Sequence, residues 1–194
     1  MGMWVGRGRK ARVAYGFDDI ALVTGTLTIN PNEVDISWDL CGRRFDIPII
    51  AAAMDGVVGP RLAIEMGRVG GLAVLNLEGI FARYENPDEV LDRIVSASQE
   101  EATKIIQSIY GESIKEELIH KRIAEIKKGG GPVAVSSIPQ RAERFAQIAQ
   151  EAGADLFIVQ STVTTARHLA TEYVPVDLKK LAGEGREIVL CGDW

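Results

Sequence analysis

Five short apolar runs, each bordered closely by glycine or proline, place the strongest constraint on how this chain can fold. Each run is nearly continuous in apolar residues, as expected for a strand that is covered on both faces of a sheet. Longer stretches with helical spacing of apolar residues lie between the runs. Strands that alternate with helices predict an α/β protein with a parallel sheet. The expected strands are residues 47–53, 72–77, 132–137, 154–159 and 187–191.

The sequence also predicts where the helices lie. Residues 60–69 and 141–152 each present an apolar face, and glycines follow both segments as stop signals. The connection from Asn86 to Lys128 is much longer, charged and helical in period. We expect it to form two or three amphipathic helices, within a helical insert over residues 86–131. Its charges indicate a solvated surface, and an oligomer contact is the alternative.

Composition narrows the class of protein. The chain has 194 residues, of which 46% are apolar and 25% charged, with a formal charge of −5. These values fit a globular protein and disfavour a nucleic-acid partner. No apolar run reaches the roughly 20 residues of a membrane span, and the amino terminus lacks a signal-peptide core. We expect a cytoplasmic protein, and we interpret the basic residues 7–12 as a solvated tail, with a phosphate- or RNA-binding arm as the alternative.

The two cysteines, Cys41 and Cys191, provide neither a disulfide framework nor a metal-ligand spacing, so no metal is expected. The chain also lacks the glycine-rich fingerprints of dinucleotide-binding and phosphate-binding loops. Polar residues instead follow the predicted strands, which is where (β/α)8 barrels carry their chemistry. A complete barrel needs about 250 residues, and five strands do not close one. We therefore expect the first half of a TIM barrel, with the C-terminal half absent.

Three segments resemble one enzyme family. Residues 15–23, with Phe17, Asp18 and Leu22, are similar to the segment that opens the catalytic domain of IMP dehydrogenases and GMP reductases. Residues 45–57, with a Met-Asp pair at 54 and 55, resemble the first barrel strand of that family, and residues 63–72 resemble its first helix. The closest resemblance is to the bacterial IMP dehydrogenase-related proteins that lack a CBS module, because residues 77–132 leave no room for one.

This resemblance implies the chemistry. In the family a cysteine thiolate attacks carbon 2 of a purine monophosphate, and a hydride passes to or from a nicotinamide cofactor. The substrate would be IMP or GMP and the cofactor NAD or NADP. The family's nucleophile follows the sixth strand, so neither cysteine of this chain takes its place, and no catalytic residue is assigned here.

The resemblance also implies the binding residues. Met54, Asp55 and Asp193 match substrate contacts, and Gln160, Ser161 and Thr162 match the corner that holds the cofactor, where the family has an aspartate in place of Gln160. The alternatives are core packing for Met54 and a helix cap for Ser161 and Thr162. The histidines, His120 and His168, are expected at the surface.

We therefore expect residues 1–194 to be a partial catalytic barrel with an N-terminal extension over residues 1–44. The expected reaction is oxidation of IMP to XMP with NAD, in a protein of which this chain is a truncated, inactive form. The alternatives are reduction of GMP to IMP with NADPH, a catalytically silent nucleotide-binding or assembly protein, and a half-barrel enzyme with its own chemistry. Open sheet edges predict a homo-oligomer.

Overall fold

The computed structural model describes residues 3–161, 171, 175–183 and 188–192, and the chain divides into two units at Asp35. In the first unit, strands β1 (Met3–Val5) and β2 (Arg9–Ala11) form an antiparallel hairpin. Short 3₁₀ helices follow at η1 (Phe17–Asp19) and η2 (Pro31–Glu33). The sequence did not predict this hairpin. The charged side chains of residues 7–12 are exposed.

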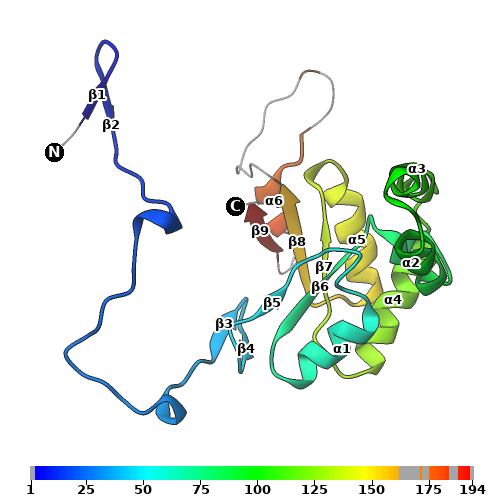
Figure 1. Ribbon diagram of the computed structural model, residues 1–194, viewed down its shortest axis with the longest axis horizontal. Helices are drawn as coiled ribbons and strands as arrows, with labels where there is room; N and C mark the ends of the chain where they lie inside the picture. The colour runs from blue at the N-terminus through cyan, green and yellow to red at the C-terminus, as the bar shows by residue number, and fades with distance from the viewer. Residues whose placement is uncertain (1–2, 162–170, 172–174, 184–187, 193–194) are drawn as a thin grey trace. The chain divides into compact units, whose positions relative to one another are not determined.

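The second unit contains a five-stranded sheet whose strand order follows the chain (Figure 1). Every neighbouring pair is parallel, as the sequence predicted. The first strand is much shorter than expected, because Pro48 and the turns around it leave only two residues to pair with the second strand. The strands are β5 (Ile50–Ala51), β6 (Leu72–Asn76), β7 (Ala134–Ser137), β8 (Leu156–Ser161) and β9 (Ile188–Gly192).

Helices connect the strands at nearly the predicted positions. Proline at the first helical position starts α1, and Gly153 in the left-handed conformation ends α5. The structure adds one helix that the sequence did not predict, α6. The helices are α1 (Pro60–Arg68), η3 (Ile80–Ala82), α2 (Pro87–Val95), α3 (Gln99–Tyr110), α4 (Glu116–Lys128), η4 (Pro139–Arg141), α5 (Ala142–Ala152) and α6 (Leu178–Gly183).

Alternate residues of the strands form two separate cores. One core buries Leu75, Val135 and Val159 beneath helices α1, α4 and α5. Helix α4 packs against both α1 and α5, so it covers the sheet as an ordinary crossover helix does. Helices α2 and α3 pack on each other and on η3 around a smaller cluster. Within the predicted insert, therefore, only α2 and α3 stand apart from the helix layer.

The opposite face of the sheet is covered near its amino ends by a second hairpin, β3 (Trp38–Leu40) and β4 (Arg43–Phe45). Phe45 packs there with Leu72 and Leu156. The hairpin turns at Cys41 and Gly42, whose φ angles are +50° and +73°. Two positive φ values suit the tight turn that joins right-handed twisted strands. Within the described ranges, no helix combines the length and the apolar character needed to cross a bilayer.

Candidate functional site

The carboxyl ends of the parallel strands carry polar residues on the face that the helices leave free. Residues alternate between faces along a strand. Asn76 therefore shares a face with Leu72, and Gln160 shares one with Leu156 and Ile158. Ser136 lies between them in register with Asn76. The chain thus builds a polar layer just beyond the apolar one, and we call the ends of β5 to β8 the strand-end rim.

Two of the predicted binding residues lie on this rim with side chains available for a ligand. Met54 follows β5 and is 58% exposed in this chain. Gln160 is half-buried, and its side-chain amide has no hydrogen-bond partner among the described residues. Three strand spacings, roughly 14 Å, separate the ends of β5 and β8. The two residues are therefore not in contact, and a ligand of nucleotide size could reach both.

Asp55 turns its carboxylate toward the segment after β6. Its Oδ2 accepts hydrogen bonds from the Ile80 amide at 3.0 Å and from the Tyr110 hydroxyl. Its Oδ1 is buried without a hydrogen-bond partner among the described residues. A Cβ at Gly79 would lie 1.7 Å from that oxygen, so the close approach requires glycine. Asp55 thus fixes the loop that carries Met54 against η3 and α3, and its contact with substrate stays a prediction.

Tyr110 connects this carboxylate to a buried arginine. Burial, reinforced by the hydrogen bond to Asp55, raises the pKa of the Tyr110 hydroxyl, which therefore stays protonated and donates. The guanidinium of Arg83 lies 5.7 Å from the centre of the Tyr110 ring. The last residue of α3 is thus held between the loop after β5 and the segment after η3.

Glu78 joins the ends of two neighbouring strands. Its Oε1 accepts from the Ser137 hydroxyl at 2.9 Å and from the Ile138 amide at 2.8 Å. Its Oε2 lies 3.1 Å from Nη1 of Arg141. Because the Ser137 hydroxyl donates to the Glu78 carboxylate, the ends of β6 and β7 are joined without a ligand.

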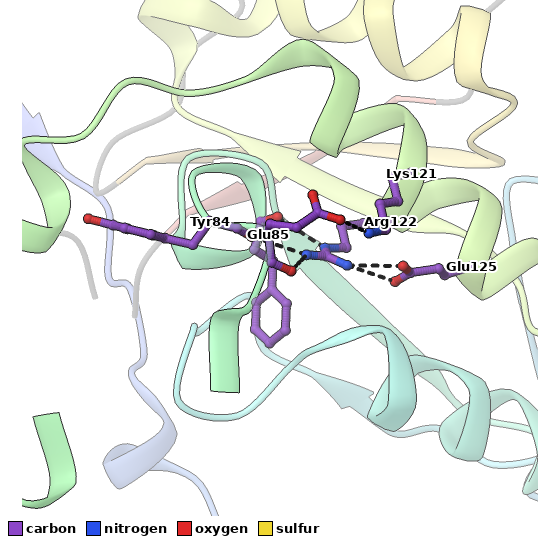
Figure 2. A network of polar contacts seen from close by, with 6 residues as sticks. Tyr84, Glu85, Lys121, Arg122 and Glu125 are labelled. Carbon is purple, nitrogen blue, oxygen red and sulfur yellow. Dashed lines mark hydrogen bonds and ion pairs between the residues drawn. The ribbon is translucent and has the colours of Figure 1, made fainter. Parts of the chain in front are cut away.

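Arg122 of α4 holds the segment that follows β6, over residues 81–85 (Figure 2). Its guanidinium donates to the carbonyl oxygens of Phe81, Tyr84 and Glu85 at 3.2, 3.1 and 2.7 Å. It also pairs with both carboxylate oxygens of Glu125, at 3.0 and 3.2 Å. A hydrogen bond from Lys121 lowers the pKa of the Glu85 carboxyl. These contacts hold residues 81–85 against helix α4.

The remaining predicted residues lie as follows. Ser161 is the half-buried last residue of β8, while Thr162, Asp193 and His168 fall outside the described residues. His120 is exposed on α4, as predicted. Cys41 is half-buried in the hairpin that covers the amino ends of the strands, so it lies away from the rim.

Known proteins resemble this chain along most of its length. The model of the IMP dehydrogenase / GMP reductase domain matches residues 14–176. The chain belongs to this family. An uncharacterized oxidoreductase of Mycolicibacterium smegmatis is 34% identical over 193 residues, which are 97% of this chain and 52% of that protein. The inosine-5'-monophosphate dehydrogenase of Methanocaldococcus jannaschii is 43% identical over 67 residues, 34% of this chain and 14% of that enzyme.

The family assignment extends to three-dimensional structure. A crystal structure of an IMP dehydrogenase/GMP reductase-like protein from Corynebacterium glutamicum superposes with a TM-score of 0.86 and is 32% identical in sequence. The match covers 99% of this chain and 52% of that one. The chain therefore spans about half the length of the relatives it matches, and it has the family's α/β fold with a parallel sheet.

Proposed function

We propose that the chain forms the first five strands of a (β/α)8 barrel in a purine-nucleotide oxidoreductase that converts IMP to XMP with NAD. The observation that carries this proposal is the strand-end rim. Barrel enzymes act at the carboxyl ends of their strands. In a chain of this family, Met54 is exposed at one of those ends, and the Gln160 side chain, at another, has no hydrogen-bond partner among the described residues.

The residues present fit a purine nucleotide and a nicotinamide cofactor. A free carboxamide such as that of Gln160 can donate to or accept from a ribose hydroxyl. The Met54 side chain offers a polarizable surface for a purine ring. The nicotinamide ring, when bound, supplies the hydride acceptor. The work of these two residues is to orient the ligands, and Asp55 holds the Met54 loop in place.

The reacting cysteine belongs to a part of the barrel beyond these five strands. A nucleophile must reach the substrate at the rim. Cys41 lies in the hairpin at the opposite end of the strands, and this position excludes it from the rim. Cys191 lies on β9, the fifth strand, in register with Gln160 of β8, whereas the family's nucleophile follows the sixth strand. The 194-residue chain by itself should therefore not turn over IMP or GMP, whichever cofactor is supplied.

A chimera can test the reaction. Joining residues 1–192 to the second half of the Corynebacterium glutamicum protein should restore a full set of strands, because the two structures superpose over this chain. We expect the chimera to reduce NAD in the presence of IMP, followed at 340 nm, and the chain alone to show no turnover. Circular dichroism establishes that each protein is folded.

Two outcomes would favour the alternatives. NADPH oxidation with GMP, without NAD reduction by IMP, would identify a GMP reductase. A folded chimera that binds IMP and performs neither reaction would identify a catalytically silent nucleotide-binding protein. Arg93→Gln, an exposed change on α2, provides the matched control for loss of activity through expression or handling.

Replacing Gln160 with aspartate should change the choice between cofactors. A carboxylate makes a charge-assisted bond to a ribose hydroxyl that an amide cannot make. Gln160→Asp in the chimera should shift the ratio of kcat/KM for NAD and NADP by about 1–2 kcal/mol toward NAD. An unchanged ratio would show that this residue does not contact the adenosine ribose, whose 2'-hydroxyl is the point at which NAD and NADP differ.

Self-association is the remaining part of the proposal. In the described residues β9 pairs only with β8, and β5 pairs only with β6. Open strand edges and uncovered apolar faces favour pairing with another copy. Sedimentation of the 194-residue chain at several concentrations should therefore show a concentration-dependent oligomer. A monomer that is independent of concentration and melts sharply would contradict this prediction.

A further inference from the structure

A cavity of about 600 Å³ is lined by three arginines and by none of the predicted binding residues. It is formed by the end of α3, the loop before α4 and the start of α5. Its volume lies within the range that holds small ligands. We call it the arginine cavity, after Arg83, Arg141 and Arg144.

Arg83 is a buried charge without a carboxylate partner. The residue is 8% exposed, and its Nε donates to the Glu78 carbonyl oxygen at 3.0 Å, while Nη1 donates to the Glu112 carbonyl oxygen. Among the described residues, no carboxylate forms an ion pair with it. Burying an ion without a counter-ion is costly, and proteins normally pair such charges. The guanidinium faces a cavity where a bound anion would complete its environment.

The other two arginines each form an ion pair with a glutamate, and each arginine side chain is exposed. Arg141 pairs with Glu78 and Arg144 pairs with Glu116, and the two guanidinium side chains are 48% and 73% exposed. The Arg144–Glu116 pair is exposed on both sides and contributes little free energy, whereas Glu78 is 15% exposed and is also bonded to Ser137 and Ile138. Arg144 can therefore turn toward a ligand at little cost, and Arg141 can offer a ligand the guanidinium nitrogens other than the Nη1 that pairs with Glu78.

Backbone dipoles add to the positive potential. Helices α4 and α5 both begin at this cavity, and neither has a side chain that caps its first amides. Helix N-termini favour anions, phosphate in particular. The acidic residues of the lining, Glu112 and Glu116, are outnumbered by the arginines.

A second cavity, of about 700 Å³, has the opposite balance. Its lining contains Arg61 and Arg122 but four acidic residues, and the guanidinium of Arg122 is already paired with one of them. Of these two cavities, only the first has more arginines than acidic residues in its lining.

We propose that the arginine cavity binds the phosphate group of a small phosphorylated molecule, at a site that adjoins the strand-end rim and is lined by none of the predicted binding residues. Arg83 supplies the buried charge, and the exposed side chains of Arg141 and Arg144 bind the phosphate oxygens from the solvent side of the cavity. Planar guanidinium groups are suited to this because each can bind two oxygens at once.

Isothermal titration calorimetry of the 194-residue chain tests the proposal. The probes are inorganic phosphate, pyrophosphate and ribose 5-phosphate, with ribose and acetate as controls at matched ionic strength. We expect saturable binding of the three phosphate probes only. Ribose 5-phosphate binding more tightly than inorganic phosphate would show that the site takes a phosphate ester, and the reverse order would show that it takes the free ion.

Variants connect the binding to the cavity. Arg141→Gln and Arg144→Gln change exposed residues and should each weaken binding about ten-fold, the equivalent of one hydrogen bond to a charged group. Arg83→Met should abolish binding, and its fold is monitored by circular dichroism. Arg61→Gln, in the second cavity, should leave the dissociation constant unchanged. Absence of saturable binding, or equal losses in Arg61→Gln and Arg144→Gln, would overturn the proposal.

Discussion

Arg122 and Arg83 are buried to a similar degree, the first bound to the segment over residues 81–85 and the second part of it, yet their surroundings differ. Arg122 is 5% exposed, bonds three backbone carbonyl oxygens and pairs with Glu125. Arg83 is 8% exposed and bonds two carbonyl oxygens, without a carboxylate among the described residues. The positive charge of Arg122 is balanced by Glu125 within the fold, so this residue stabilises the protein. That of Arg83 is compensated only in part, which is the arrangement expected where a ligand completes the site.

The largest expected effect comes from removing the compensated charge. Arg122→Met leaves Glu125 without its partner and three carbonyl oxygens without their donor, so it should lower the free energy of unfolding by about 3 kcal/mol. Arg83→Met loses two hydrogen bonds but also an unpaired buried charge, and should cost about 1 kcal/mol or less. Urea denaturation measures both. Equal losses would mean that the two arginines play the same structural part.

A smaller effect should follow from filling the space beside Asp55. Gly79→Ala places a methyl group against Oδ1 of Asp55, which must move and carry its loop with it. We expect a loss of about 2 kcal/mol in unfolding free energy. Gly56→Ala is the matched control, because a Cβ there meets no atom within 4 Å. If both variants are equally stable, the contact between Asp55 and Gly79 does not constrain the loop.

The smallest effect concerns the Tyr110 hydroxyl, whose pKa is raised in the folded protein. A raised pKa means that the folded state retains this proton more firmly than the unfolded state. The stability it contributes is therefore complete below the ordinary tyrosine pKa of about 10 and is lost as the pH rises beyond it. Unfolding measured from pH 8 to 11 should show a smaller decline for Tyr110→Phe than for the unmodified chain.

A control separates this effect from general alkaline unfolding. Tyr15 is 73% exposed in the N-terminal unit, so Tyr15→Phe should leave the alkaline decline as it is. A decline that is the same with and without the Tyr110 hydroxyl would show that its bond to Asp55 does not stabilise the fold.

The fold was largely predictable because its signals are local and periodic. Apolar runs and glycine stops placed β6 to β9 and helices α1 and α5 within a few residues. The hairpin β3–β4 was missed, although Cys41-Gly42 sits where a two-residue turn needs positive φ angles, because its strands are only three residues long. Pairing this short depends on burial against the sheet, which the local sequence does not reveal.

The site was predictable only where it follows a strand. Met54 and Gln160 were assigned from the family resemblance, and their binding roles stay predictions, whereas Arg83 and Tyr110 meet Glu78, Asp55 and the cavity through contacts between distant segments. One signal was present for Arg122. It lies four residues from both Leu118 and Ile126, so a charge occupies the apolar face of its helix. Such a charge predicts a buried partner, even though the sequence does not say which one.

The agreement between strand order and chain order has a consequence for biosynthesis. When a sheet grows by sequential neighbours, each strand that leaves the ribosome can join a neighbour that is already folded. Strands that are close in the chain pair with each other, so the entropy of closing long loops stays small where the connection is short. The β6-to-β7 connection is the exception, since α2, α3 and α4 must all emerge first. We expect the growing sheet to stop there until β7 emerges, with the edge of β6 exposed in the meantime.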